Sequence, residues 1–312
     1  MEIKKCAAFW KHTNVRGNNQ IFPCCRFKSP VGVFDGNLDS ILFSEAYEKL
    51  RNSNIDDLPQ CAKCSYEEKN NKKSLRQKFN EQYDTDKIEL EFLEIGFDNI
   101  CNLTCDGCWS DWSSSWSKKI NPDADKKSHY TSIEEIKHVP KSVRKILFLG
   151  GEPLMTNRHE KFLELIENPS LVDVIYNTNG TFILRDDFVV FLQKFKSAKF
   201  ILSIDAYGNL NDKVRSGSSW KDIIYFIEQI KRFKFDLEVN TVLHINNWHG
   251  IKKLESFVRS LNVEWTINIL TYPKHLDISN IENKNQILDI INQTDIPNKS
   301  YVLNHLTGDL HK

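Results

Sequence analysis

Strand and helix patterns alternate along the middle of the chain, and this alternation constrains the fold most. Six short segments rich in Ile, Val, Leu and Phe are typical of buried strands, and amphipathic helical patterns lie between them. The predicted strands are 90–97, 144–149, 172–176, 199–204, 236–243 and 263–270. Such alternation is typical of a parallel sheet, either doubly wound or closed into a barrel. We therefore predict an α/β fold over residues 88–270, and in a barrel the functional residues would follow the strands.

The segments on either side have a different character. Residues 1–87 contain paired cysteines and a basic, Asn-rich stretch, so we predict a separate small module that a metal stabilises. Residues 271–312 contain one helical pattern, formed by Ile287, Ile290 and Ile291, and we predict that they form a C-terminal extension.

Charge and hydropathy argue against several classes of protein. Lys and Arg together number 42, as do Asp and Glu, so the net charge is zero and gives no evidence for nucleic-acid binding. No apolar run approaches the roughly 20 residues of a membrane-spanning helix, and the first residues lack the apolar stretch of a secretion signal. We therefore expect a cytoplasmic protein without a membrane partner.

The eight cysteines are the most informative residues for chemistry, because clustered cysteines in a reducing compartment usually bind metal or do redox work. Cys101, Cys105 and Cys108 are spaced C-x3-C-x2-C directly after the first predicted strand. Three thiolates cannot complete a tetrahedral zinc site alone. They can hold three irons of a [4Fe–4S] cube and leave the fourth iron open. A zinc site with a ligand from elsewhere stays an alternative, because the spacing does not exclude it.

Four motifs, taken in order, resemble those of the radical S-adenosylmethionine (SAM) superfamily. They are the cysteine motif after the first strand, Gly150-Gly151-Glu152-Pro153 after the second, Asn177-Thr178-Asn179-Gly180 after the third, and Ser203-Ile204-Asp205 at the end of the fourth, with Arg215 a few residues later. Each alone could be a turn, a helix cap or a surface residue. All four together at strand ends favour the superfamily and its partial (β/α)6 barrel.

The resemblance implies a cofactor and a role for each motif. Cys101, Cys105 and Cys108 would be the catalytic residues, since they would hold a [4Fe–4S] cluster whose open iron binds SAM. Reductive cleavage of SAM would give a 5′-deoxyadenosyl radical that abstracts hydrogen from a substrate, with the electron supplied by a flavodoxin- or ferredoxin-type donor. The implied SAM-binding residues are Gly150, Gly151, Glu152, Pro153, Asn179, Ser203, Asp205, Arg215 and Trp109.

The cysteine loop departs from the superfamily pattern at one position. An aromatic residue commonly precedes the third cysteine, near the adenine, but here that residue is Gly107 and Trp109 follows the cysteine instead. In a helix, Trp109, Trp112 and Trp116 would share one face, and we expect them mainly to pack that helix.

The cysteines of the first quarter resemble the twitch module, a shortened (half-)SPASM domain that binds one auxiliary [4Fe–4S] cluster in many radical SAM enzymes. The expected ligands are Cys6, Cys24, Cys61 and Cys64, with Cys25 spare. In most relatives this module follows the barrel. Here it precedes the barrel, as in the N-terminal twitch subgroup. A zinc ion held by the same four thiolates is the alternative that the spacing tolerates.

The histidines add no second metal signal. None of the nine has another histidine at metal-ligand spacing on a recognisable helix. Each of them, including His244, is therefore interpreted as a surface residue or a hydrogen-bonded core residue.

The predicted activity is that of a radical SAM oxidoreductase or transferase, whereas the substrate is open. Relatives with a twitch or SPASM module act on ribosomal peptides, proteins, small sugars or nucleotide-derived molecules. We expect a peptide or protein substrate, with oxidation or rearrangement of a small carbohydrate or nucleoside as the alternative. The non-enzymatic alternative is a module that binds metal or transfers electrons, and the intact Cys101 and Gly150 motifs argue against it.

Overall fold

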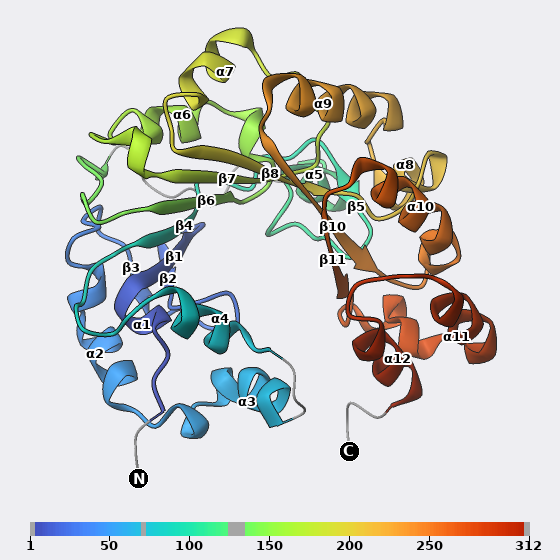
Figure 1. Cartoon of the computed structure of the whole chain (residues 1–312), viewed down its shortest axis with the longest axis horizontal. Coiled ribbons are helices and arrows are strands. Elements are labelled where there is room, and N and C mark those ends of the chain that lie inside the picture. Colours follow the sequence, from blue (N-terminus) through green and yellow to red (C-terminus); the bar gives the residue numbers. More distant parts are fainter. Residues whose placement is uncertain (1–3, 70–72, 124–134, 309–312) are drawn as a thin grey trace. The chain divides into compact units, whose positions relative to one another are not determined.

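The computed structural model describes residues 4–69, 73–123 and 135–308, and Figure 1 traces the chain. The chain divides into two compact units. The first unit comprises Met1–Asn99, Lys127–Ile175 and Phe191–Ser197, and the second comprises Ile100–Lys126, Tyr176–Val190 and Ala198–Lys312. The domain boundaries predicted after residues 87 and 270 were drawn from the order of the sequence motifs, and they stay a prediction.

The first unit is built on a sheet that the N-terminal segment extends. Its strands lie in the order β6 (Lys145–Leu149), β4 (Phe92–Gly96), β1 (His12–Arg16), β2 (Gln20–Phe22) and β3 (Gly32–Val33). β4 pairs in parallel with both β6 and β1, whereas β2 and β3 are added antiparallel. The segment before residue 87 thus shares a sheet with the first predicted strand of the α/β region.

Helices and a cysteine-rich core complete the first unit. The helices are α1 (Ala8–Lys11), α2 (Glu45–Asn52), α3 (Ala62–Lys69), α4 (Leu75–Gln82) and α6 (Arg158–Leu163). Phe9, Phe27 and Phe79 pack in one buried cluster with Cys6, Cys24 and Cys61. The sequence explains where α4 begins, because the Ser74 hydroxyl accepts a hydrogen bond from the Gln77 N–H and the Gln77 side chain accepts one from the Ser74 N–H.

The second unit contains the later parallel strands. β8 (Ser197–Ser203), β10 (Asp236–Leu243) and β11 (Glu264–Ile269) are parallel, with β10 in the middle, and a short antiparallel ribbon joins β5 (Thr104–Cys105) to β9 (Arg215–Ser216). Its helices are α5 (Ser114–Ile120), α8 (Asn209–Val214), α9 (Trp220–Phe233), α10 (Ile251–Leu261), α11 (Lys284–Gln293) and α12 (Lys299–Thr307). Strand β7 (Asp173–Thr178) runs from the first unit into the second, and helix α7 (Asp186–Leu192) runs from the second into the first.

The α/β class with parallel strands is confirmed, because each of the six predicted strands overlaps an observed one. The expectation that Trp109, Trp112 and Trp116 pack one helix is wrong for the first two. Helix α5 begins only at Ser114, so Trp109 and Trp112 lie outside it and each is 39% exposed. Ser113 is the reason, since its hydroxyl caps the helix by accepting a hydrogen bond from the Trp116 N–H.

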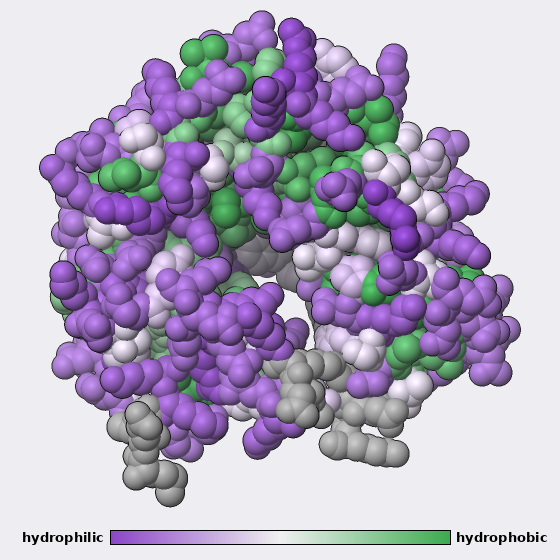
Figure 2. Space-filling view, in the orientation of Figure 1, coloured by the Kyte–Doolittle hydropathy of each residue, from purple (hydrophilic) through white to green (hydrophobic). Residues whose placement is uncertain are grey.

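The surface is largely hydrophilic where it can be seen. Figure 2 shows that hydrophilic side chains cover most of the face in view. Among the described residues, no helix combines the length and the apolar character that crossing a membrane requires.

Candidate active site

Cys101, Cys105 and Cys108 lie in the loop after β4, at the beginning of the second unit. All three are partly buried and none forms a disulfide. The middle cysteine is on β5, where Cys105 and Arg215 are paired across the ribbon with β9. The ribbon therefore places a guanidinium group in the same region as the three thiols.

A run of serines holds the cysteine loop in place. Ser114 Oγ accepts a hydrogen bond from the Cys101 N–H over 3.1 Å, and the Ser115 hydroxyl donates to the Cys101 carbonyl over 2.6 Å. The Ser113 hydroxyl donates to the Leu103 carbonyl over 2.7 Å. The sequence analysis missed these positioning residues. The only signal was a cluster of hydroxyls before a helix, which by itself indicates no more than a cap.

Burial determines the charge state of the thiols in the loop. Burial raises the pKa of Cys105 to about 12 although Arg215 opposes the rise, and burial raises the pKa of Cys108 to about 11. These thiols are therefore neutral at pH 7 when no metal is bound. Only thiolates ligate iron or zinc, so the charged form here needs a cation, as cluster iron would provide. The residues present fit such a cluster.

Two predicted SAM contacts bind each other. Arg215 Nη1 donates a hydrogen bond to Asp205 Oδ2 over 2.7 Å, and the side chains are only 12% and 5% exposed. The other Asp205 oxygen accepts from the Val242 N–H over 2.7 Å. Burial alone would lower the pKa of Arg215, but Cys105 and Asp205 outweigh it and the pKa is raised. Arg215 Nε is buried and has no hydrogen-bond partner among the described residues, so it is a spare donor.

The turn after β7 is tied to the cysteine loop. Asn179 Nδ2 donates to Asn102 Oδ1 over 2.9 Å, and its Oδ1 accepts from both the N–H and the hydroxyl of Thr181. Gly180 has φ +71°, and a Cβ there would overlap Leu202, so the turn requires glycine. Ser203 ends β8, opposite Asn240 of β10.

The Gly150–Pro153 motif lies in the first unit, directly after β6. Gly150 has φ +121°, and a Cβ there would overlap the carbonyl oxygen of Asp98, which also accepts a hydrogen bond from Gly151 N–H over 3.0 Å. Glu152 is buried and its Oε1 accepts from the Leu154 N–H over 3.1 Å. The glycines thus let two backbone segments approach, and Glu152 caps the short 3-10 helix Pro153–Met155.

Gly107 and Trp109 explain the missing aromatic residue of the cysteine loop. Gly107 has φ +76°, and a Cβ there would lie 2.5 Å from Leu270 Cδ2, so a larger side chain would require Leu270 to move. Trp109 lies edge-to-face with Tyr272, with ring centroids 6.1 Å apart. Leu270 thus occupies the space that an aromatic residue at position 107 would need.

His244 is a candidate site residue that no sequence motif identifies. It directly follows β10, is buried, and its Nδ1 accepts from the Asn246 N–H over 3.3 Å. Burial lowers its pKa, against the charges of Asp205 and Asp106. The neutral ring therefore carries its hydrogen on Nε2, which has no partner among the described residues. The rule that functional residues follow strands could have identified it.

A second cysteine site lies in the first unit. Cys6, Cys24, Cys61 and Cys64 are all buried and line one cavity, whose empty space is about 330 Å³ including a part open to solvent. Burial raises the pKa of Cys6 to about 12 and that of Cys61 to about 11. The structure thus brings together the four cysteines expected to act as ligands, whereas Cys25 is exposed and does not line the cavity.

The arrangement of the cysteines differs from that of a single-ion site. Within residues 4–69, 73–123 and 135–308, no group of three or more His, Cys, Asp or Glu side chains is placed to hold one metal ion. In a [4Fe–4S] cube each thiolate binds a different iron, so the ligands are spread more widely than around one ion.

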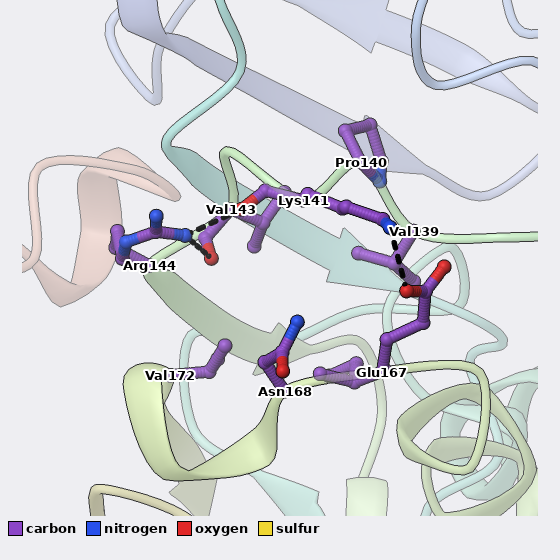
Figure 3. Close-up of a pocket in the computed structure, with 9 residues that line it drawn as sticks. Val139, Pro140, Lys141, Val143, Arg144, Glu167, Asn168 and Val172 are labelled. Atoms are coloured by element: carbon purple, nitrogen blue, oxygen red, sulfur yellow. Dashed lines mark hydrogen bonds and ion pairs between the residues drawn. The ribbon is translucent and has the colours of Figure 1, made fainter.

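A further pocket of the first unit lies at the amino ends of the strands (Figure 3). Arg144 directly precedes β6 and Val172 directly precedes β7. The charged groups there have partners, since Lys141 Nζ lies 2.9 Å from Glu167 Oε2 and Arg144 donates to the carbonyls of Lys141 and Val143. Functional residues of β/α folds gather at the carboxyl ends of strands, so we assign no function to this pocket.

Comparisons with known proteins point to one family. Residues 96–258 match the family model of the radical SAM superfamily. The GTP 3′,8-cyclase of Campylobacter lari is 25% identical over 214 residues, which are 65% of this chain and 63% of that protein. The chain thus spans less than two thirds of the length of this curated relative.

Solved structures with a similar chain path include two peptide- or SAM-bound proteins. Native anSMEcpe with bound AdoMet is 16% identical, with a TM-score of 0.49, over 71% of this chain and 63% of that chain. Streptococcus suis SuiB bound to the precursor peptide SuiA is 17% identical, with a TM-score of 0.42, over 89% and 55%.

Proposed function

Because the chain belongs to the radical SAM superfamily, we propose that Cys101, Cys105 and Cys108 hold a [4Fe–4S] cluster that binds SAM. The observation that supports this most directly is the placement of three partly buried thiols on one loop beside a buried guanidinium group. When bound, the cluster would supply the electron that cleaves SAM and so make hydrogen abstraction from a substrate possible.

The residues around the cysteine loop would position SAM. Arg215 and His244 each retain a buried N–H donor, which we assign to bound SAM or substrate. Asp205 would fix Arg215 and, with Ser203, face the ribose and methionyl part. Asn179 would hold the turn after β7 in place through Asn102.

Two further groups of residues complete the proposed SAM site. The Gly150–Pro153 backbone and the Glu152 carboxylate would accept charge-assisted hydrogen bonds from the SAM ammonium. Trp109, which is partly exposed beside Tyr272, would contact the adenine. In this proposal residues 88–270 form the partial (β/α)6 barrel of the superfamily.

We propose a second, auxiliary [4Fe–4S] cluster in the cavity of the first unit, which would make residues 1–87 an N-terminal twitch module. The support is the cavity itself, which Cys6, Cys24, Cys61 and Cys64 line together. Four thiolates would occupy all four irons. Such a cluster suits electron transfer or structural support and leaves no iron open for a substrate.

A peptide or protein is the substrate class that we propose, with a flavodoxin- or ferredoxin-type protein as electron donor. The second candidate is a nucleoside triphosphate, which the match to a GTP cyclase favours. An assay of 5′-deoxyadenosine formation after dithionite reduction, with and without GTP, distinguishes the two substrate candidates. Consumption of GTP together with faster 5′-deoxyadenosine formation would support the nucleotide, whereas unchanged GTP would exclude it.

Iron counting and SAM cleavage test the two clusters. Anaerobically reconstituted protein should contain about eight irons per chain and should form 5′-deoxyadenosine from SAM. Cys105→Ala should abolish that product and remove about half of the iron, whereas the matched control Cys25→Ala should keep both. Zinc with little iron, or full activity in Cys105→Ala, would overturn the proposal.

A further inference from the structure

Two arginines line the cavity that contains Cys6, Cys24, Cys61 and Cys64, which we call the four-cysteine cavity. Their side chains are largely buried, with 5% of Arg76 and 21% of Arg26 exposed. The Nη1 atom of each is buried and has no hydrogen-bond partner among the described residues. Buried donors in folded proteins almost always have a partner, so these two indicate an acceptor that the described part of the chain does not supply.

Helix α3 binds other nitrogen atoms of the two guanidinium groups. Arg76 Nε donates to Glu68 Oε1 over 2.9 Å and its Nη2 also binds Glu68. Arg26 Nη2 donates to Glu67 Oε1 over 3.1 Å. The same helix carries Cys64. One helix therefore fixes both arginines and one of the proposed ligands, and each arginine is left with a spare donor.

The chemistry of the cavity indicates which acceptor these donors need. Besides the arginines, the described residues that line it are the four cysteines, the amide Gln60 and apolar side chains such as Phe9, and none of them is a carboxylate. A cube with four thiolates carries net negative charge, and reduction makes that charge more negative. Two guanidinium groups would compensate for that charge.

We propose that Arg26 and Arg76 donate hydrogen bonds through Nη1 to the sulfur atoms of the cluster in the four-cysteine cavity and thereby raise its reduction potential. Hydrogen bonds to sulfur are one of the main determinants of the potential of iron–sulfur clusters, because they stabilise the more negative reduced state. This inference depends on the proposed auxiliary cluster, and its test is arranged to separate the two.

The test uses the full chain with only one cluster present. The variant Cys101→Ala/Cys105→Ala/Cys108→Ala removes the proposed SAM cluster and should retain about four irons. In this background the reduction potential is measured by redox titration followed by electron paramagnetic resonance. Arg26→Gln should lower the equilibrium constant for one-electron reduction by about tenfold, which corresponds to about 59 mV.

Further variants separate charge from hydrogen bonding and from misfolding. Arg26→Lys keeps the charge, but its single nitrogen cannot both pair with Glu67 and take the place of Nη1, so the potential of this variant should fall below that of the background. Arg76→Gln should act in the same direction, with Arg26 as the safer position because Arg76 also holds Glu68. The control Lys49→Gln removes an exposed charge that pairs with Glu45, and it should leave the potential unchanged.

The outcomes are distinct. A background variant that binds no iron, or binds zinc, would refute the auxiliary cluster and this inference together. A background variant with a normal cluster whose potential is the same in Arg26→Gln and Arg76→Gln would refute the inference alone. A potential for Arg26→Lys equal to that of the background would also refute it, since the effect would then be one of charge.

Discussion

Arg215→Met should destabilise the protein by about 3 kcal/mol, because it leaves the Asp205 carboxylate buried without its cation. Removing one partner of a buried ion pair typically costs about 3–5 kcal/mol. The lower end applies here, since Asp205 Oδ1 keeps the hydrogen bond from the Val242 N–H at 2.7 Å. The entropy of unfolding is about 2.1 cal/mol/K per residue. For 312 residues it is about 0.66 kcal/mol/K, so the expected fall in Tm is about 5 °C.

The assay is thermal unfolding followed by far-UV circular dichroism under anaerobic conditions. Arg215→Met/Asp205→Asn removes both charges. Its loss of stability should be smaller than the sum of the losses in the two single variants, by a coupling of about 1–3 kcal/mol. The matched control is Arg259→Met. Its guanidinium is 66% exposed and pairs with the exposed Asp295, so its Tm should change little. Additive single effects, or a Tm of Arg215→Met equal to that of the wild type, would show that Arg215 does not compensate Asp205.

Two further predictions concern the same unit. Gly107→Ala should lower the Tm, because a positive φ costs about 1–2 kcal/mol in a residue other than glycine and the new Cβ would lie 2.5 Å from Leu270; adding Leu270→Ala should recover the steric part, and purely additive melting would contradict this. The wild-type protein should lose stability below about pH 6.5, because burial lowers the pKa of His244 and the unfolded chain then binds a proton that the folded chain does not. His244→Asn should make this loss smaller. Identical pH profiles of unfolding would contradict the second prediction.

The strands could be predicted because their signal is local. A buried strand needs only a short apolar run, and the prediction at 236–243 coincides with β10. The order of the site motifs was equally accessible, since each directly follows a predicted strand. The gathering of Cys6, Cys24, Cys61 and Cys64 in one cavity was less accessible. Spacing alone does not fix contacts between residues so far apart in sequence, and the prediction came from the family resemblance.

Side-chain partners could not be predicted, because they depend on how distant segments meet. The pair Asp205–Arg215 joins the end of β8 to β9, whereas the family motifs predict only that both residues contact SAM. In the sequence His244 is typical of a core histidine, and only the structure shows that its Nε2 has no partner among the residues described. The expectation that Trp109 and Trp112 lie on α5 is wrong for a related reason, since the hydroxyl of Ser113 decides where that helix begins.

A structural role and a ligand role are compatible in the same side chain when it has more donors than its own fold uses. Arg215, Arg26 and Arg76 each bind a carboxylate through one part of the guanidinium group, and another nitrogen of each is buried without a partner in the described part of the chain. Leaving a donor in this state costs about 1–3 kcal/mol. A chain that used these arginines only for ion pairs could avoid that cost by exposing or removing the second nitrogen. The same arrangement in both units, each time beside cysteines, therefore favours an anionic group as the common acceptor.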